Sequence, residues 1–144
     1  MPLHLVKLCV GVTTLEEMRE WVDERAAERR ARAQPQEQIH TTRMLPRRGA
    51  ELLDGGSLYW VIKGNVQARQ RLVGIRPFTD GEGVSRCHLV LDPVLIPTRW
   101  QPRRAFQGWR YLAEAEAPAD LGPGGQEDEL PGDLRSQLAQ LGLL

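Results

Sequence analysis

The stretch that decides the fold is residues 55–64, Gly-Gly-Ser-Leu-Tyr-Trp-Val-Ile-Lys-Gly. Between its glycines stand five bulky residues, Leu58 to Ile62, of which two are aromatic and two are β-branched. This composition is typical of a strand buried on both faces, so we expect it at the centre of a sheet. Lys63 then marks the point where the strand emerges into solvent.

The segments on both sides of this strand show strand and helix patterns. Thr14 with Glu17 three residues later forms a capping box, which predicts the start of a long helix over residues 15–33. Pro46 suits the start of a short helix over residues 47–53, which Gly55 and Gly56 would close. Further strands are predicted over residues 3–10, 39–45, 66–76, 84–91, 94–96 and 106–112.

These elements predict an α+β fold in one domain over residues 1–112. A small curved, mostly antiparallel sheet, or a partly closed barrel, would explain the glycines at strand ends, where a sheet must bend. One long N-terminal helix would accompany the sheet. Residues 113–144 are predicted to be an acidic linker and a C-terminal amphipathic helix, packed on or near the domain, with Leu134, Leu138 and Leu141 on one face.

The net charge of zero conceals a strong partition along the chain. Residues 39–111 carry a net charge of +7, whereas residues 112–144 carry −6. A basic segment of this kind favours an anionic partner such as a nucleic acid. Alternatively, the basic middle and the acidic tail neutralise each other within one molecule, and the sequence leaves both interpretations open.

Composition and motifs exclude several classes of protein. Two cysteines are too few for a disulfide framework, and no run approaches the about 20 apolar residues that span a bilayer. We therefore expect a cytoplasmic protein that does not interact with membranes. No phosphate-binding glycine-rich loop, zinc-spaced cysteine pair or nucleophile elbow occurs, so neither a cofactor nor a metal is expected. Cys87 and His88 are neighbours, but adjacent strand residues face opposite ways, and Cys87 is interpreted as core.

The strongest functional signal is residues 100–111, Trp-Gln-Pro-Arg-Arg-Ala-Phe-Gln-Gly-Trp-Arg-Tyr. Arginine binds phosphate, aromatic faces stack on bases, and glutamine can read a base edge. The alternative is that Phe106, Trp109 and Tyr111 belong to the sheet core. Gly108, within the predicted strand, would leave a gap for a ligand or for the backbone of a neighbouring strand.

Several motifs of this chain occur together in one family. They are Glu51–Gly64, Gln67–Arg71, Arg86-Cys87, Leu91–Pro93 and Arg103–Leu112, together with the start Leu3–Gly11. With these motifs the chain resembles an alphaproteobacterial family, family fourteen eighty-nine of the domains of unknown function. The resemblance covers nearly the whole chain, and it implies no activity.

A second resemblance rests on Tyr59-Trp-Val-Ile-Lys63 and on Gly55-Gly56 before that strand. In these features the chain is similar to the PUA-like small barrels, which include the EVE and ASCH domains. The similarity covers about a third of the sequence, and it implies a barrel that binds RNA or modified bases in a cleft. The long helix after the first strand and the acidic tail depart from that pattern.

Three functions are consistent with these features. The favoured hypothesis is a PUA-like module that binds RNA or a modified nucleotide, with Trp60 or Trp109 stacking on a base. The second is a small enzyme acting on a nucleotide or another anion, which requires Lys63, His40 or Asp54 to converge on one pocket. The third is an interaction protein that uses the acidic tail or the leucine-rich helix. The residues predicted to bind the nucleic acid or anion are Lys63, Arg69, Arg71, Arg103, Arg104, Arg110, Trp60, Trp109 and Gln107.

Overall fold

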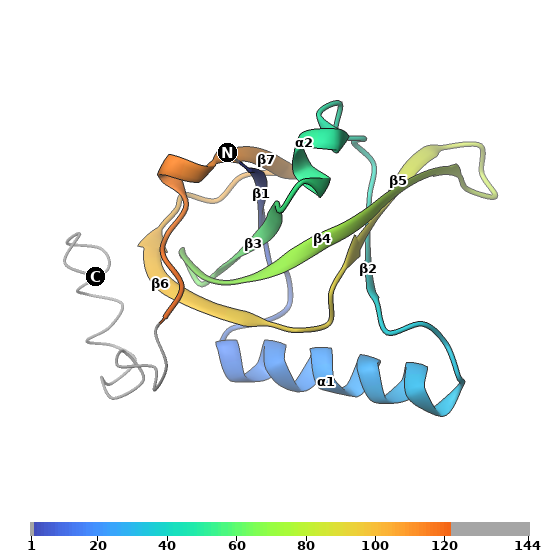
Figure 1. Ribbon diagram of the computed structural model, residues 1–144, viewed down its shortest axis with the longest axis horizontal. Helices are drawn as coiled ribbons and strands as arrows, with labels where there is room; N and C mark the ends of the chain where they lie inside the picture. The colour runs from blue at the N-terminus through green and yellow to red at the C-terminus, as the bar shows by residue number, and fades with distance from the viewer. Residues whose placement is uncertain (1, 122–144) are drawn as a thin grey trace.

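A computed structural model describes residues 2–121 as an α+β fold with one curved seven-stranded sheet (Figure 1). The main path of the sheet is β2-β5-β4-β3-β1-β7, and β6 pairs with β4 beside it. All pairs are antiparallel except β1 with β3, so the predicted mostly antiparallel sheet is confirmed. The elements are β1 Leu3–Leu8, α1 Leu15–Ala31, β2 Gln38–Thr42, α2 Gly49–Leu53, β3 Ser57–Ile62, β4 Asn65–Thr79, β5 Ser85–Leu91, β6 Ile96–Pro102, β7 Trp109–Ala113 and a 3-10 turn over Glu114–Glu116.

Strand β3 is the centre of the sheet, as its composition predicts. All six of its residues are buried, and it lies between β1 and β4. The indole of Trp60 donates a hydrogen bond of 2.9 Å to the side chain of Gln70 in β4, so its polar atom is satisfied inside the core. Lys63 is exposed directly after the strand, in the turn that leads into β4.

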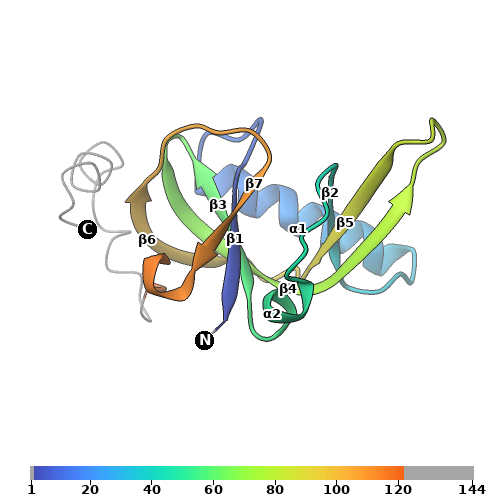
Figure 2. The ribbon, with the colours of Figure 1, turned by 90° about the horizontal axis from the view of Figure 1, so that it is seen from above.

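The long strand β4 connects two parts of the sheet. Its first half pairs with β3 and β6, and its second half pairs with β5. The register shifts between Leu72 and Gly74, and such irregularities bend a strand and increase its twist. The sheet therefore turns at this point, and β2 and β5 extend away from β1, β3 and β7, as Figure 2 shows.

Helix α1 packs on the sheet through one side. Its buried residues Leu15, Met18 and Val22 belong to the main hydrophobic core. Thr14 caps the helix by accepting a hydrogen bond of 3.1 Å from the backbone of Glu17, as predicted. The Glu17 carboxylate accepts from Thr13 at 2.7 Å, so the reciprocal half of the capping box is replaced by this contact. In Figure 1 the helix lies beneath the sheet.

Side chains of β7, at one end of the main path, hydrogen-bond to the segment that follows β2, at the other end. Trp109 in β7 donates to the backbone oxygen of Met44, just after β2, at 2.8 Å. The hydroxyl of Tyr111 accepts from the backbone amides of Arg47 and Arg48 at 2.9 and 3.2 Å. Within residues 2–121 the sheet is therefore open, and these hydrogen bonds connect the two sides where a closed barrel would have a strand ladder.

Two strand predictions need correction. The strand predicted over residues 94–96 and limited by Pro97 is instead displaced to Ile96–Pro102, because Val94 and Leu95 lie outside any strand. β6 lies off the main path of the sheet, where a strand tolerates the missing amide donors of its prolines. Strand β7 begins at Trp109 rather than at Phe106. The φ angle of +68° at Gly108 turns the chain there, a conformation that glycine adopts readily.

Two other expectations concern the ends of the chain and the membrane. The predicted C-terminal helix with Leu134, Leu138 and Leu141 lies outside the described residues. Within residues 2–121, no helix has the length and apolar character required to cross a bilayer.

Candidate functional site

Four of the cations assigned to anion binding from the sequence lie in neighbouring segments: the turn after β3, the loop between β6 and β7, and β7 itself. We call Lys63, Arg103, Arg104 and Arg110, together with the ring of Phe106, the basic cluster. The amide of Arg103 donates to the oxygen of Gly64 at 2.9 Å, which places the start of the β6–β7 loop beside the turn that carries Lys63. The guanidinium carbons of Arg103 and Arg110 lie 5.6 and 5.3 Å from the centroid of the Phe106 ring.

The cations of the basic cluster make no ion pair within residues 2–121. Arg110 donates only to backbone oxygens, those of Gln107 at 3.1 Å and Trp109 at 3.4 Å. Gln107, which was also assigned to binding from the sequence, is exposed beside Arg110. Other arginines behave differently, and their carboxylate partners lie within reach: Arg48 with Glu51, Arg69 with Asp120, Arg76 with Glu37 and Arg86 with Asp80.

Two predicted arginines do not join this cluster. Arg69 binds Asp120 through two hydrogen bonds of 2.8 and 2.7 Å and donates to Ser57 at 2.8 Å. Its guanidinium therefore holds the segment after β7 against the sheet. Arg71 is exposed, but in the β3–β4 register it stands opposite Ser57 at the start of β3. Lys63 follows the other end of β3. Arg69 and Arg71 therefore lie toward the start of β3, outside the basic cluster.

The predicted stacking roles of Trp60 and Trp109 on a basic face are not supported by their positions. Both side chains are 4% exposed and belong to the hydrophobic core. Their indole N–H groups bind Gln70 and the oxygen of Met44. Phe106 is only partly buried and lies between two arginines, so it is the aromatic residue available in the basic cluster.

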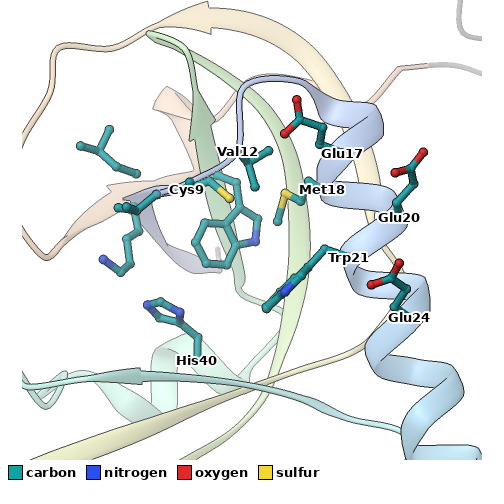
Figure 3. Close-up of a pocket in the computed structure, with 13 residues that line it drawn as sticks. Cys9, Val12, Glu17, Met18, Glu20, Trp21, Glu24 and His40 are labelled. Carbon is teal, nitrogen blue, oxygen red and sulfur yellow. The ribbon is translucent and has the colours of Figure 1, made fainter.

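A separate pocket lies between α1, the end of β1 and β2. Its volume is about 560 Å³, and Figure 3 shows Trp21 and His40 projecting into the space between α1 and β2. Trp60 forms part of its inner wall, and Lys7 and Cys9 line it from the end of β1. Sequence reasoning missed this pocket because His40 of β2 and Trp60 of β3 are distant in the chain from the β1 and α1 residues that they face.

His40 is the most unusual polar group of the pocket. Its ring packs edge-on against Trp60, with the ring centroids 5.3 Å apart. Its Nε2 atom is buried and has no hydrogen-bond partner within the described part of the chain. Burial, aided by the positive charge of Lys7, lowers the pKa of His40 to about 4. The imidazole is therefore neutral at physiological pH, with one donor and one acceptor nitrogen.

The pocket is poorly suited to nucleophilic catalysis. Burial raises the pKa of Cys9 to about 11, so its sulfur is a thiol rather than a thiolate near neutral pH. Of the three residues that the enzyme hypothesis requires, only His40 lines the pocket; Lys63 and Asp54 do not. Residues 2–121 also contain no group of three or more metal-ligating side chains.

A family model described as "Protein of unknown function (DUF1489)" matches residues 5–144. Comparison with curated proteins and comparison with solved structures give no match.

Proposed function

The chain belongs to the family described as "Protein of unknown function (DUF1489)", and we propose that it binds single-stranded RNA through the basic cluster. One observation carries this proposal. Arg103 and Arg110 approach the same Phe106 ring, and their charges have no carboxylate partner within residues 2–121.

The chemistry of the basic cluster matches the two parts of a single strand. Guanidinium groups bind phosphate oxygens in a fork geometry, and an aromatic ring offers a face to an unpaired base. Lys63 adds a flexible cation at the adjacent turn, and exposed Gln107 offers an amide for a base edge. A stacked base contributes about 1–3 kcal/mol in such sites, so Phe106 would add affinity without strict sequence preference.

Two features favour binding over catalysis. Lys63, Arg104 and Arg110 of the basic cluster are exposed and Arg103 is partly exposed, and the cluster lacks a nucleophile–base pair. In the pocket the Cys9 thiol is protonated at neutral pH, because burial raises its pKa to about 11. The PUA-like character of the fold, including a cleft for a modified nucleotide, stays a prediction based on the Tyr59–Lys63 motif.

The test removes two cations of the cluster. Arg103→Ala with Arg104→Ala should weaken binding to a single-stranded RNA oligonucleotide in a fluorescence anisotropy titration across salt concentrations. The slope of log affinity against log salt should fall by up to about 1.4, because about 0.7 counterion is released per phosphate contact on a single strand. Stability should change by less than about 0.5 kcal/mol, as for other surface substitutions.

The matched control is Arg30→Ala with Arg32→Ala at the end of α1, where both side chains are exposed. It removes the same charge and should leave the salt slope close to that of the parent. An equal loss of RNA affinity in both double variants would show that net charge, rather than the basic cluster, governs binding. Salt-independent binding, or no RNA binding by the parent protein, would refute the proposal.

A further inference from the structure

We propose that the pocket between α1, β1 and β2 binds a small planar heteroaromatic molecule that carries no net negative charge. Trp21 would stack on its ring, and Nε2 of His40 would hydrogen-bond its polar edge. This site goes beyond the proposed RNA binding, because it uses a different face of the sheet and a different ligand chemistry.

The walls of the pocket suit a flat ring. Trp21 is 39% exposed although it stands on a helix whose neighbouring residues Met18 and Val22 are buried. Across from it lies the ring of His40 (Figure 3), and Trp60, which is in T-shaped contact with that ring, also lines the pocket. The volume of about 560 Å³ lies within the range of small-molecule sites, which are mostly apolar with a few placed polar groups.

His40 supplies the polar group. A buried nitrogen without a partner is destabilising, and such atoms are rare in folded proteins. Nε2 of His40 is buried and has no partner within residues 2–121, yet its ring lines the pocket. A ligand whose ring edge carries a complementary donor or acceptor would satisfy this atom. Heterocycles with ring nitrogens or amino groups have such edges, whereas purely hydrocarbon rings do not.

The charges around the pocket determine the sign of the ligand. Three acidic residues of α1, Glu17, Glu20 and Glu24, are among the residues that line the pocket, against the lining cation Lys7 and the guanidinium of Arg25 over the Trp21 ring. Phosphate or carboxylate groups on a ligand would meet this excess of negative charge. A neutral or cationic heterocycle would not. The guanidinium carbon of Arg25 already lies 4.8 Å from the centroid of the Trp21 ring, so a ligand would stack on the remaining face of that ring.

The pocket and the basic cluster lie on opposite faces of the sheet. In the β1–β7 pair Lys7 is opposite Trp109, and Val6 is opposite Arg110. Successive side chains in a strand point to opposite faces, so Lys7 and Arg110 face different ways. Ligand binding at one site can therefore be measured separately from binding at the other.

The experiment uses two matched pairs of probes with the full chain. Adenosine is compared with adenosine 5′-monophosphate, and 4-aminoquinoline is compared with quinoline-4-carboxylate, by ligand-observed NMR and equilibrium dialysis. The neutral or cationic member of each pair should bind, and its anionic counterpart should bind at least about tenfold more weakly, because a charge–charge contact near a protein surface exceeds that free energy.

Substitutions then locate the binding. Trp21→Ala should weaken binding of the better probes about tenfold or more through loss of stacking, and Trp21→Phe should retain most of it. His40→Phe, which keeps a ring and removes the nitrogen, should also weaken binding. The control is Leu53→Ala on α2, because Leu53 is similarly exposed, at 41%, and does not line the pocket.

Three results would overturn the inference. One is that no probe of either pair binds at millimolar concentration. Another is that the anionic probes bind as tightly as their partners. The third is that Trp21→Ala and Leu53→Ala behave alike in these titrations. RNA binding by Trp21→Ala should match the parent protein, so failure of the pocket and failure of the basic cluster are separate outcomes.

Discussion

His40 links the composition of the pocket to the pH dependence of folding. Its pKa is lowered to about 4 by burial and by Lys7, whereas an unfolded chain has a histidine pKa near 6.5. The unfolded state therefore binds more protons between these values. The contribution of neutral His40 to the free energy of unfolding is complete above about pH 6.5 and is lost as the pH falls toward 4. One proton per molecule sets an upper limit of about 1.4 kcal/mol per pH unit for this loss. The actual loss is smaller, because the ring is partly exposed to solvent.

Urea unfolding at pH 7.0, 6.0 and 5.0 measures this loss. His40→Gln should flatten the curve in that window, since the titrating group is gone. Asp80 does not interfere, because hydrogen bonds from Arg86 and from backbone amides lower its pKa to about 2, below the window. If parent and variant have equal slopes between pH 5 and 7, the protonation of His40 does not control stability.

A substitution of Trp60 tests whether β3 is the centre of the sheet. Trp60→Asp would bury a charge without a counterion and leave Gln70 without its indole donor. Such a change costs several kcal/mol, enough to unfold a domain of ordinary stability. Circular dichroism at 25 °C should show the loss of the native spectrum. Trp21→Asp, at an exposed position, is the control and should remain folded; a native-like melt of Trp60→Asp would refute the central role of β3.

At the scale of elements, Gly56 lies between α2 and β3 in the chain and packs closely against the start of β1. A Cβ atom at this position would lie 2.2 Å from the oxygen of Leu3 and 2.3 Å from the oxygen of Leu52. Gly56→Ala should therefore destabilise the protein by about 2 kcal/mol or more, because backbone atoms on both sides must move. Gly81→Ala is the control, since its Cβ would meet no atom within 4 Å in the β4–β5 turn.

Thermal melting of both glycine variants measures this difference. Gly56→Ala should melt well below the parent protein, and Gly81→Ala should melt close to it. Equal melting temperatures for the two variants would show that α2 and β1 can separate at little cost. Glycine is required at position 56 because β1, α2 and β3 converge there and a side chain does not fit.

At the scale of the whole molecule, the separation of charge along the chain remains the dominant electrostatic feature. The basic cluster belongs to the segment with a net charge of +7, and the acidic segment includes Glu127, Asp128 and Glu129, outside the described residues. Neutralising these three residues to Gln or Asn should strengthen retention on heparin or RNA at low salt, because competing negative charge is removed. Neutralising Glu16, Glu20 and Asp23 on α1 is the charge-matched control.

A stronger effect of the tail substitutions than of the α1 substitutions would show that the tail competes for the basic cluster. Equal elution of the parent and the tail variant would show that the tail and the basic cluster do not interact. An equal effect of both sets of substitutions would assign the change to net charge alone. Elution salt concentration on a heparin column measures each outcome directly.

Several features could be predicted from the sequence because they depend on neighbouring residues. The burial of β3 follows from its five bulky residues, the start of α1 from Thr14 and Glu17, and the exposure of Lys63 from its place after the strand. Residues 93–113 contain no acidic residue, which predicts only that Arg103 and Arg104 have no partner nearby in the sequence. These inferences need only the periodicity of strands and helices and the chemistry of their ends.

Other features were decided only by the tertiary structure, because they depend on contacts between distant segments. Arg69 reads as a surface cation in the sequence, but Asp120, 51 residues later, pairs with it. Trp109 reads as an available aromatic ring, but the loop after β2 accepts its N–H and the core covers it. The pocket around His40 exists because β1, α1 and β2 meet in space, and no local pattern specifies that meeting.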